Sequence, residues 1–492
     1  MIKLSNAALH SLPAGIARPR YDRSKLTPGI VHIGTGNFHR AHQAVYLDDL
    51  FNAGAGHDWA LIGAGVRPHD AEMRQKLGAQ DYLTTVIELD PKGNRPRVTG
   101  PMIGFAEVAP DNAPLIAAMS DPAIRIVSLT VTEGGYFVDP STGTFDPTHP
   151  DIAADARQPG TPATAFGAIL AALRVRRASG LAPFTVMSCD NLPGNGHVTR
   201  DAVTGLARLF DAELADWISA NVAFPNAMVD RITPATGPRE IALAGSFGIE
   251  DAWPVTCEPF RQWVIEDHFT AGRPPLEEVG VTFTDHVHLY EAMKIRILNG
   301  GHAIIAYAGG MMDIEYAHEA MAEPLIRAFL GKVEREEVIP HVPAVPDTDL
   351  NDYFATIEDR FANPEIADTI RRLCLDGSNR QPKFIIPSLR DNLAKGRVPL
   401  GLILESALWC RYCAGTTDSG AVTAPNDPRW DELTVIAKKA KTEPNAWLAM
   451  ADIYGTTGRD PRVQEAFATA LNALWTRGTR AVLEDYLTGR PL

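Results

Sequence analysis

The chain has 492 residues, with 46 Lys and Arg against 60 Asp and Glu, so its formal net charge is −14. Its composition, 45% hydrophobic and 22% charged, is typical of a soluble globular protein of two or three domains and argues against a disordered, collagen-like or coiled-coil chain. The negative charge opposes non-specific binding to nucleic acid or to an anionic membrane, so we expect neither as a partner.

The N-terminus, the apolar stretches and the cysteines bear on the cellular compartment. Residues 1–20 lack the continuous apolar core of a signal peptide. The most apolar stretch, 295–312, is interrupted by Arg296, Asn299 and His302, which argues against a membrane-spanning helix. The five cysteines form an odd, sparse set that fits reduced thiols. We therefore expect a cytoplasmic protein.

Strand-like and helix-like stretches alternate through the first part of the chain, and helices dominate the rest. The expected strands are 29–34, 59–66, 82–89, 124–132 and 184–191, and the helices among them include 38–53 and 164–180. This alternation predicts a parallel, doubly wound α/β sheet. The later helical segments are 290–309, 324–338, 351–373, 400–414, 428–441 and 462–488. We therefore expect an α/β domain over 1–285 and a mostly helical domain over 286–492.

A glycine turn follows the first of these strands and opens the next helix. It reads Gly34-Thr35-Gly36-Asn37-Phe38-His39. In a dinucleotide-binding fold this position holds the pyrophosphate against free backbone N–H groups. The third glycine of the usual fingerprint is His39 here, so the motif alone leaves nucleotide binding and a plain strand–helix turn equally open.

An acidic residue after the second strand would hydrogen-bond an adenosine ribose and repel a 2′-phosphate. Asp70 is the candidate, although it lies 36 residues beyond Gly34 and the usual spacing is about 20. On spacing alone, a solvated loop aspartate explains Asp70 equally well.

Polar residues share one sector of the otherwise apolar helix expected over 290–309. With Lys294 at 0° and about 100° per residue, Glu291 lies at about 60°, His302 at about 80° and Asn299 at about 140°. Because the flanking residues are strongly apolar, we interpret this sector as a functional face rather than a solvated one.

Further polar residues follow predicted strands or lie in turns. Asn191 stands just past the strand over 184–191, at the edge where open α/β sheets bind ligands, although Asn-Leu-Pro-Gly is more often only a turn. Asp230 lies in PNAMVDRITP, and Arg380 and Lys383 lie in DGSNRQPKF. These patterns do not by themselves place the three residues in a site.

Three short patterns have spacings that metals use. They are His39-x-x-His42, His286-x-His288 and Cys410-x-x-Cys413. None has a further ligand in a supporting context, so we expect no metal site.

Six motifs taken together identify a family. GTGNFHRAHQ, SLTVTEGGY, FTVMSCDNLPGNG, FPNAMVDRITP, CEPFRQWVIED and KIRILNGGH occur in this order. From about residue 28 to the C-terminus the chain resembles the long-chain mannitol dehydrogenase family of polyol-specific, NAD-dependent dehydrogenases. The resemblance implies a Rossmann-type N-terminal domain and a helical C-terminal domain like that of 6-phosphogluconate dehydrogenase, in agreement with the pattern of elements.

The resemblance also implies roles for residues. The family uses a lysine base and no metal, and that lysine matches Lys294. Asn191 and Asn299 would hold the reacting oxygen, and His302 a neighbouring hydroxyl. The resemblance places Lys383 at a substrate-contacting position, and Glu291 and Asp230 at acidic positions near the site. We also count Arg380 among the substrate-binding candidates. Gly34, Gly36, Asn37, Phe38 and Asp70 would hold NAD.

We expect a dehydrogenase that interconverts a polyol and its ketose, with D-mannitol and D-fructose before arabinitol and sorbitol. The alternatives are a hexuronate reductase of the same superfamily and a non-catalytic nucleotide-binding sensor. Arg380 and Lys383 would suit a uronate carboxylate, which keeps the reductase open. His69 stands where polyol members carry an acidic residue before the ribose-binding aspartate, so discrimination against NADP is expected to be weaker. The family leans towards monomers.

Overall fold

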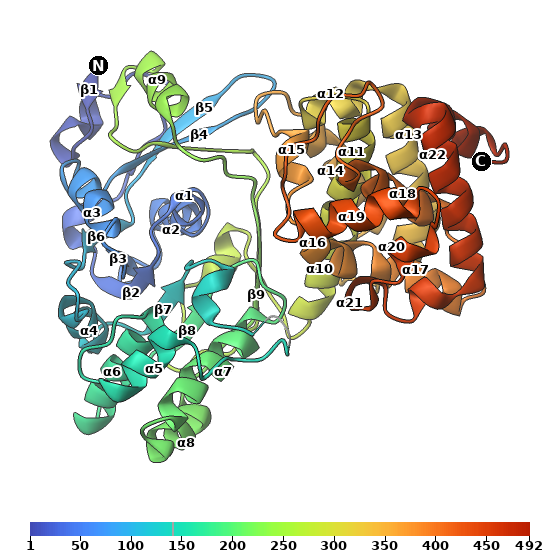
Figure 1. Cartoon of the computed structure of the whole chain (residues 1–492). Coiled ribbons are helices and arrows are strands. Elements are labelled where there is room, and N and C mark those ends of the chain that lie inside the picture. Colours follow the sequence, from blue (N-terminus) through green and yellow to red (C-terminus); the bar gives the residue numbers. More distant parts are fainter. Residues whose placement is uncertain (140–141) are drawn as a thin grey trace. The chain divides into compact units, whose positions relative to one another are not determined.

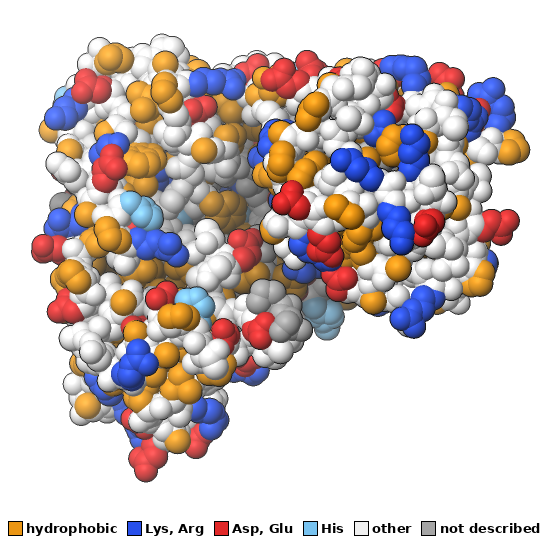
Figure 2. All heavy atoms as spheres, viewed as in Figure 1, with side chains coloured by type: hydrophobic (Ala, Val, Ile, Leu, Met, Phe, Trp, Pro, Cys, Tyr) orange, Lys and Arg blue, Asp and Glu red, His pale blue; other side chains and the backbone are white. Residues whose placement is uncertain are grey.

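The computed structural model describes residues 1–139 and 142–492 and divides them into two compact units, Met1–His288 and Leu289–Leu492 (Figure 1). The first unit combines strands and helices, and the second is helical. This confirms the expected α/β and helical fold classes. Figure 2 shows acidic and basic side chains interspersed over the visible face of each unit. Among the described residues, none of the helices combines the length and the apolar character needed to cross a bilayer.

A five-stranded parallel sheet organises the first unit. Its order is β6-β3-β2-β7-β8. The strands are β2 (Pro28–Ile33), β3 (Ala60–Ala64), β6 (Met102–Phe105), β7 (Ile126–Leu129) and β8 (Thr185–Ser188). Along the chain, β3 and β6 are added on one side of β2, and β7 and β8 are then added on its other side. The strand order therefore reverses between β2 and β7, and ligands of such sheets bind beyond the carboxyl ends of the strands at this point.

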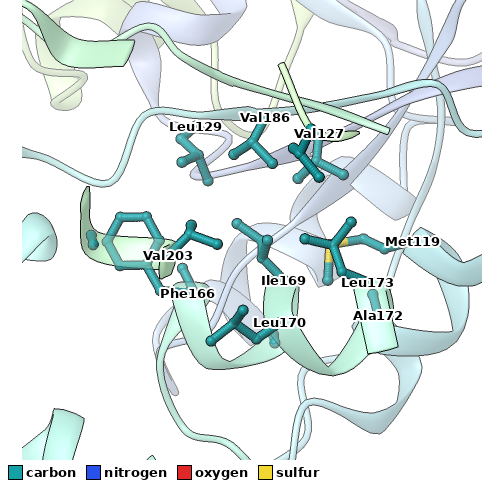
Figure 3. Close-up of a cluster of buried hydrophobic side chains, with 14 of the residues drawn as sticks. Met119, Val127, Leu129, Phe166, Ile169, Leu170, Ala172, Leu173, Val186 and Val203 are labelled. Carbon is teal, nitrogen blue, oxygen red and sulfur yellow. The ribbon is translucent and has the colours of Figure 1, made fainter. Parts of the chain in front are cut away.

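Apolar residues on both faces of these strands explain why they form a buried sheet. β7 and β8 are buried along their whole length, as expected for a parallel sheet covered by helices. Helix α6 (Ala165–Ala178) covers one face, and Figure 3 shows Ile169 and Leu173 pointing from this helix toward Val127 and Val186. The Thr164 hydroxyl accepts a hydrogen bond from the Gly167 N–H at 3.0 Å and so caps the helix.

Two expectations for the first unit are wrong in detail. The helix expected over 38–53 breaks at His42 into α1 (Asn37–Ala41) and α2 (Gln43–Asn52). A ring nitrogen of His42 lies 2.8 Å from the Gln262 carbonyl, and the backbone at His42 leaves the helical range with φ −122° and ψ −83°.

The strand expected over 82–89 is β4 (Thr84–Glu88), which does not join the parallel sheet. It forms a second sheet of order β11-β4-β5, antiparallel to β5 (Arg95–Thr99) and parallel to β11 (Val255–Cys257). The short turn after β4 allows an antiparallel hairpin with β5 but is too short for the helical crossover that a parallel pairing of these two strands would require.

Two smaller sheets complete the first unit. β9 (Ala227–Asp230) pairs antiparallel with β12 (Gln262–Ile265), which also pairs with β13 (Thr282–Phe283). β1 (Ile2–Lys3) pairs with β10 (Ile249–Glu250).

The second unit packs around α18, which is buried from Gly401 to Cys413 and contacts α11 and α22. Its helical elements are α10 (Val287–Met293, which begins at the end of the first unit), η5 (Lys294–Asn299), α11 (Gly300–Met311), α12 (Ala317–Ala322), α13 (Pro324–Val333), η6 (Glu334–Val338), η7 (Ile339–His341), α14 (Leu350–Phe361), α15 (Ile370–Leu373), α16 (Gly377–Phe384), α17 (Ile386–Ala394), α18 (Leu400–Cys413), α19 (Trp430–Ala440), α20 (Asn445–Leu448), α21 (Ala451–Tyr454), η8 (Thr457–Arg459) and α22 (Pro461–Thr488).

The helix expected over 351–373 is in fact two helices, α14 and α15. Pro364 disfavours helical backbone in the residue before it, so α14 ends at Phe361. The short helices α16 and α17 were not expected, because Pro382 interrupts the pattern that would have indicated a helix.

Candidate active site

The candidate residues fall into two groups, one on each unit. The first group lies at the carboxyl ends of the strands of the first unit, beginning with Gly34 after β2. Gly34 has φ +97°, and a Cβ at this position would lie 2.0 Å from the Thr130 carbonyl oxygen. Gly36 has an ordinary φ of −66°, and a Cβ there would have no atom within 4 Å. Gly34 is therefore required by the chain itself, whereas Gly36 leaves space for a bound group.

The side chains after the glycine turn hold its shape. Asn37 donates hydrogen bonds to the Pro234 carbonyl at 3.0 Å and to the Thr236 hydroxyl at 2.8 Å. Its side chain is thus committed to the protein, and its contribution to a phosphate is limited to the backbone. The Phe38 ring stacks on His42 with centroids 4.9 Å apart.

His39 replaces the third glycine of the fingerprint, and a ring stack explains why. Its ring lies on His32 with centroids 3.4 Å apart and planes 14° apart. Both rings are fully buried, and burial lowers the pKa of His39 well below its ordinary value and that of His32 to about 3. Two neutral imidazoles therefore fill the helix–strand contact that a glycine fills elsewhere.

Asp70 returns to the end of β3 despite its long spacing from Gly34. Its carboxylate accepts a hydrogen bond from the Arg67 N–H at 2.9 Å, and the Asp70 N–H donates to the Arg67 carbonyl at 2.9 Å. A Cβ on Gly65 would lie 2.2 Å from Cγ of Asp70, so the side chain lies directly against the residue that follows β3. This is where a ribose-binding acid belongs, and His69 is exposed beside it.

Asn191 follows β8, and the residue before it fixes the backbone there. The Asp190 carboxylate accepts hydrogen bonds from the N–H groups of Val131 and Thr132, at 2.9 and 3.0 Å, and from the Tyr136 hydroxyl at 2.6 Å. Burial raises the pKa of Asp190. The segments after β7 and β8 are thus tied together, and Asn191 itself is exposed.

Asp230 is the last residue of β9 and is 5% exposed. The neighbouring Arg231 is structural, because it donates to the carbonyl oxygens of Ala41 and Glu258 at 2.7 and 2.9 Å and to the Glu88 carboxylate at 2.7 Å.

The second group of candidates lies on the second unit and centres on η5. The segment from Lys294 to Asn299 is a π-helix, so the uninterrupted α-helix expected over 290–309 is wrong. Hydrogen bonds from i to i+5 make this turn wider than an α-helical turn, and π segments are frequent at functional sites. Lys294 and Asn299, five residues apart, therefore stand about one turn apart and closer in angle than the α-helical estimate.

The burial of these residues is graded. Lys294 is 7% exposed, whereas Glu291, Asn299 and His302 are partly exposed. The His302 ring stacks on Phe361, the last residue of α14, with centroids 4.1 Å apart and planes 19° apart. This stack fixes the plane of the imidazole, and it joins two residues that are far apart in the sequence.

Helix α16 brings Arg380 and Lys383 next to this group. α16 contacts η5, and a Cβ on Gly300 would lie 3.4 Å from the Phe384 carbonyl oxygen. Glycine at 300 thus allows the end of α16 to approach the residue after Asn299. Lys383 is exposed, whereas one Arg380 guanidinium nitrogen donates to the Leu373 carbonyl at 3.1 Å.

A buried carboxyl supports α16 from behind. The Gln381 amide donates to Glu405 at 2.6 Å, and burial raises the pKa of the fully buried Glu405 to about 8. Glu405 is therefore neutral at neutral pH, and Gln381 locates the helix that carries Arg380 and Lys383.

The metal-like patterns do not form clusters. Within residues 1–139 and 142–492, no three His, Cys, Asp or Glu side chains gather as a metal site would require. Cys410 and Cys413 are buried in α18.

Sequence reasoning missed Asp190, Phe361 and Gln381. Asp190 carried a usable signal, because an acid at the carboxyl end of a buried strand needs partners. The other two act through contacts between distant segments, which no local pattern reveals.

Comparisons with known proteins identify the family of the chain. The family described as the mannitol dehydrogenase Rossmann domain matches residues 28–278, and the mannitol dehydrogenase C-terminal domain matches residues 286–475. A mannitol 2-dehydrogenase from Cereibacter sphaeroides is 70% identical over 96% of this chain and 99% of its own length. One from Aspergillus terreus is 43% identical over 95% of each chain.

Two solved structures are similar over almost the whole chain. The Pseudomonas fluorescens mannitol 2-dehydrogenase in ternary complex with NAD and D-mannitol has a TM-score of 0.87 and 44% identity over 99% of each chain. A substrate-free D-sorbitol dehydrogenase has a TM-score of 0.91 and 33% identity, and it covers 98% of this chain and 100% of its own. Two family matches that together span both units, and relatives similar over nearly their full length, establish that the chain belongs to the mannitol dehydrogenase family.

Proposed function

We propose that the chain is an NAD-dependent polyol dehydrogenase that interconverts D-mannitol and D-fructose, with Lys294 as the general base. The observation that carries this function is the full-length similarity to mannitol 2-dehydrogenases, one of them solved with NAD and D-mannitol bound. Lys294 is buried on a π-helical segment, and because such segments are frequent at functional sites this position supports the choice of base.

The first unit has the features that NAD requires. A Cβ at Gly34 would clash with the Thr130 carbonyl, so only glycine fits the turn, and Gly36 borders open space. The Asp70 carboxylate lies against Gly65, the residue that follows β3. Backbone groups from Gly34 to Phe38 would hold the pyrophosphate, and Asp70 would hold the adenosine ribose. When bound, NAD supplies the hydride acceptor for the carbinol carbon.

The chain's own residues handle the proton and the developing charge. Lys294 takes the proton of the reacting hydroxyl, and the amides of Asn191 and Asn299 donate hydrogen bonds to the oxygen as negative charge develops on it. His302, held on Phe361, binds an adjacent hydroxyl. In the reverse direction Lys294 returns the proton to the ketose oxygen.

Other polar residues bind the remainder of the polyol chain. Lys383 and Arg380 on α16 and Glu291 on α10 are assigned to substrate hydroxyls in this proposal, as is Asp230 on β9. In this proposal residues 1–285 hold the cofactor and contribute Asn191 and Asp230 to the substrate, whereas residues 286–492 carry the base and the other substrate-binding residues. Five free, buried cysteines support a reducing, cytoplasmic setting, and we propose that the chain acts as a monomer.

The direct test is NADH oxidation by the purified protein with D-fructose, and NAD reduction with D-mannitol, with the products identified by chromatography. We expect turnover in both directions and D-mannitol as the product from D-fructose. NADH binding without turnover of any ketose would instead indicate a non-catalytic sensor.

A further inference from the structure

A buried arginine lies within the segment that carries Lys294 and Asn299. Arg296 is 8% exposed, and its three guanidinium nitrogens engage three different partners. Nε donates to the Ser388 hydroxyl at 3.0 Å, one terminal nitrogen donates to the His341 carbonyl at 2.9 Å, and the other lies 2.9 Å from the Asp391 carboxylate. These partners lie on α17 and η7, so Arg296 joins η5 to two other elements.

The position of Arg296 in the turn directs it away from the reacting groups. Two residues along this wider turn correspond to about half a turn, so Arg296 leaves the helix on the side roughly opposite to Lys294. The anchored side chain therefore holds the segment from the side that faces away from Lys294.

A second buried group lies behind the same segment. Glu334 is fully buried at the start of the π-helical η6, and neither carboxyl oxygen has a hydrogen-bond partner among the described residues. Burial raises the pKa of Glu334 well above its ordinary value, and Arg296 is the first of the cations that oppose this rise. A Cβ on Gly301 would lie 3.4 Å from a Glu334 carboxyl oxygen, so this side chain packs closely behind the helix.

This arrangement constrains how η5 can move. A π-turn is rare and occurs mostly as a single turn inside an α-helix, often at functional sites. A buried guanidinium that leaves its partners is strongly disfavoured, so rotation or sliding of η5 is opposed by three polar contacts at once. Lys294 and Asn299 lie on either side of this anchor in the sequence.

We propose that Arg296 is a positioning residue that fixes the rotation of η5 and thereby aims Lys294 and Asn299. The inference rests on the proposed function, since it concerns the aim of the base and of the amide in that reaction. Displacing reacting groups by about 1 Å costs on the order of 100-fold in rate, and this sets the size of the expected effect.

The test compares Arg296→Met, Arg296→Lys and a matched control, Arg411→Met. Arg411 is 7% exposed in the same unit, donates to the backbone carbonyls of Thr416 and Thr417, and stacks over the Trp475 ring at 4.0 Å. Its removal leaves a similar buried defect, on α18 rather than on η5. All variants are assayed well below their unfolding transitions, which are measured in urea.

We expect Arg296→Met to lower kcat for D-fructose reduction by about 100-fold, with KM changed less than kcat and with NADH binding unchanged. Arg296→Lys, which keeps a charge and a donor, is expected to recover about a tenth of the activity or more. Arg411→Met is expected to lower the urea midpoint and to retain kcat. Equal kcat losses in Arg296→Met and Arg411→Met, or a wild-type kcat in Arg296→Met, would overturn the proposal.

A milder variant keeps the proposal testable if Arg296→Met does not fold. Ser388→Ala removes only the acceptor of Nε and should lower kcat by about 2- to 10-fold without affecting NADH binding. An unchanged kcat in that variant would also contradict the positioning role. A wild-type protein inactive on every polyol and ketose would refute the proposed function itself, which separates the two failures.

Discussion

Replacing Gly36 by alanine tests the cofactor cradle with little disturbance of the fold. Gly36 has φ −66°, and its new methyl group would meet no atom within 4 Å. The substitution should therefore leave stability unchanged or raise it by about 0.4–1 kcal/mol, because alanine restricts the unfolded chain. If the pyrophosphate approaches this backbone, the methyl group overpacks the complex at a cost of about 1–3 kcal/mol. NADH binding should then weaken by about 5- to 150-fold.

Two further glycines separate the contributions. Gly34→Ala combines the left-handed backbone with a Cβ only 2.0 Å from the Thr130 carbonyl oxygen, so it should lose both stability and NADH affinity, with a loss of about 2–5 kcal/mol in unfolding free energy. Gly15 has φ +92° with no atom within 4 Å, so Gly15→Ala reports the backbone cost alone, about 1–2 kcal/mol, with NADH binding intact. Calorimetric titration and urea unfolding measure the two quantities. A Gly36→Ala protein with wild-type NADH affinity would refute the assignment of the pyrophosphate to this turn.

Three more predictions concern single side chains. Lys294→Ala should keep NADH affinity and lower mannitol oxidation by about 10²–10⁴-fold, and near-wild-type turnover at neutral pH would show that Lys294 is not the base. Asp70→Ser should improve the use of NADP relative to NAD in steady-state kinetics, and an unchanged ratio would make Asp70 a bystander. Glu405 has its pKa raised by burial from 4.5 to about 8, so its neutral form stabilises the fold fully below pH 4.5, and this stability is lost as the pH rises towards 8. In Glu405→Gln the side chain cannot ionise, so its urea midpoint should fall less than that of the wild type between pH 5 and 8. A difference in urea midpoint between the two proteins that does not vary with pH would contradict the assignment.

The sequence was sufficient to predict four strands of the first unit's central sheet, β2, β3, β7 and β8, because they are largely apolar on both faces, but it did not predict the short edge strand β6. Val31 and Val127 are fully buried, and such runs are distinctive of parallel strands between helices. The distance in sequence between Gly34 and Asp70 did not predict that Asp70 lies at the end of β3. The turn at Arg67 brings its carboxylate back to Gly65, and this turn is visible only in the structure. The hairpin at β4 was missed because a run of apolar residues does not reveal which strand it pairs with.

The helical unit was predictable in outline and less so around the site. A periodicity of about 3.6 residues marks a helix but does not reveal where an extra residue widens a turn, so η5 was expected to be α-helical. Arg296 looked like an interruption of an apolar stretch, and its role is visible only once α17 and η7 are in place. The stack of His302 on Phe361 likewise depends on tertiary structure.

The proposed function requires a site built for a neutral polyol and its ketose. Its most direct test is NADH oxidation with D-fructose and with D-fructuronate, compared as kcat/KM at equal concentrations and near-neutral pH. Arg380 and Lys383 are the cations that a uronate carboxylate would engage, so this comparison tests the polyol assignment at its weakest point. We expect D-fructose to be preferred by at least about tenfold. A clear preference for D-fructuronate would contradict the polyol assignment and favour a hexuronate reductase.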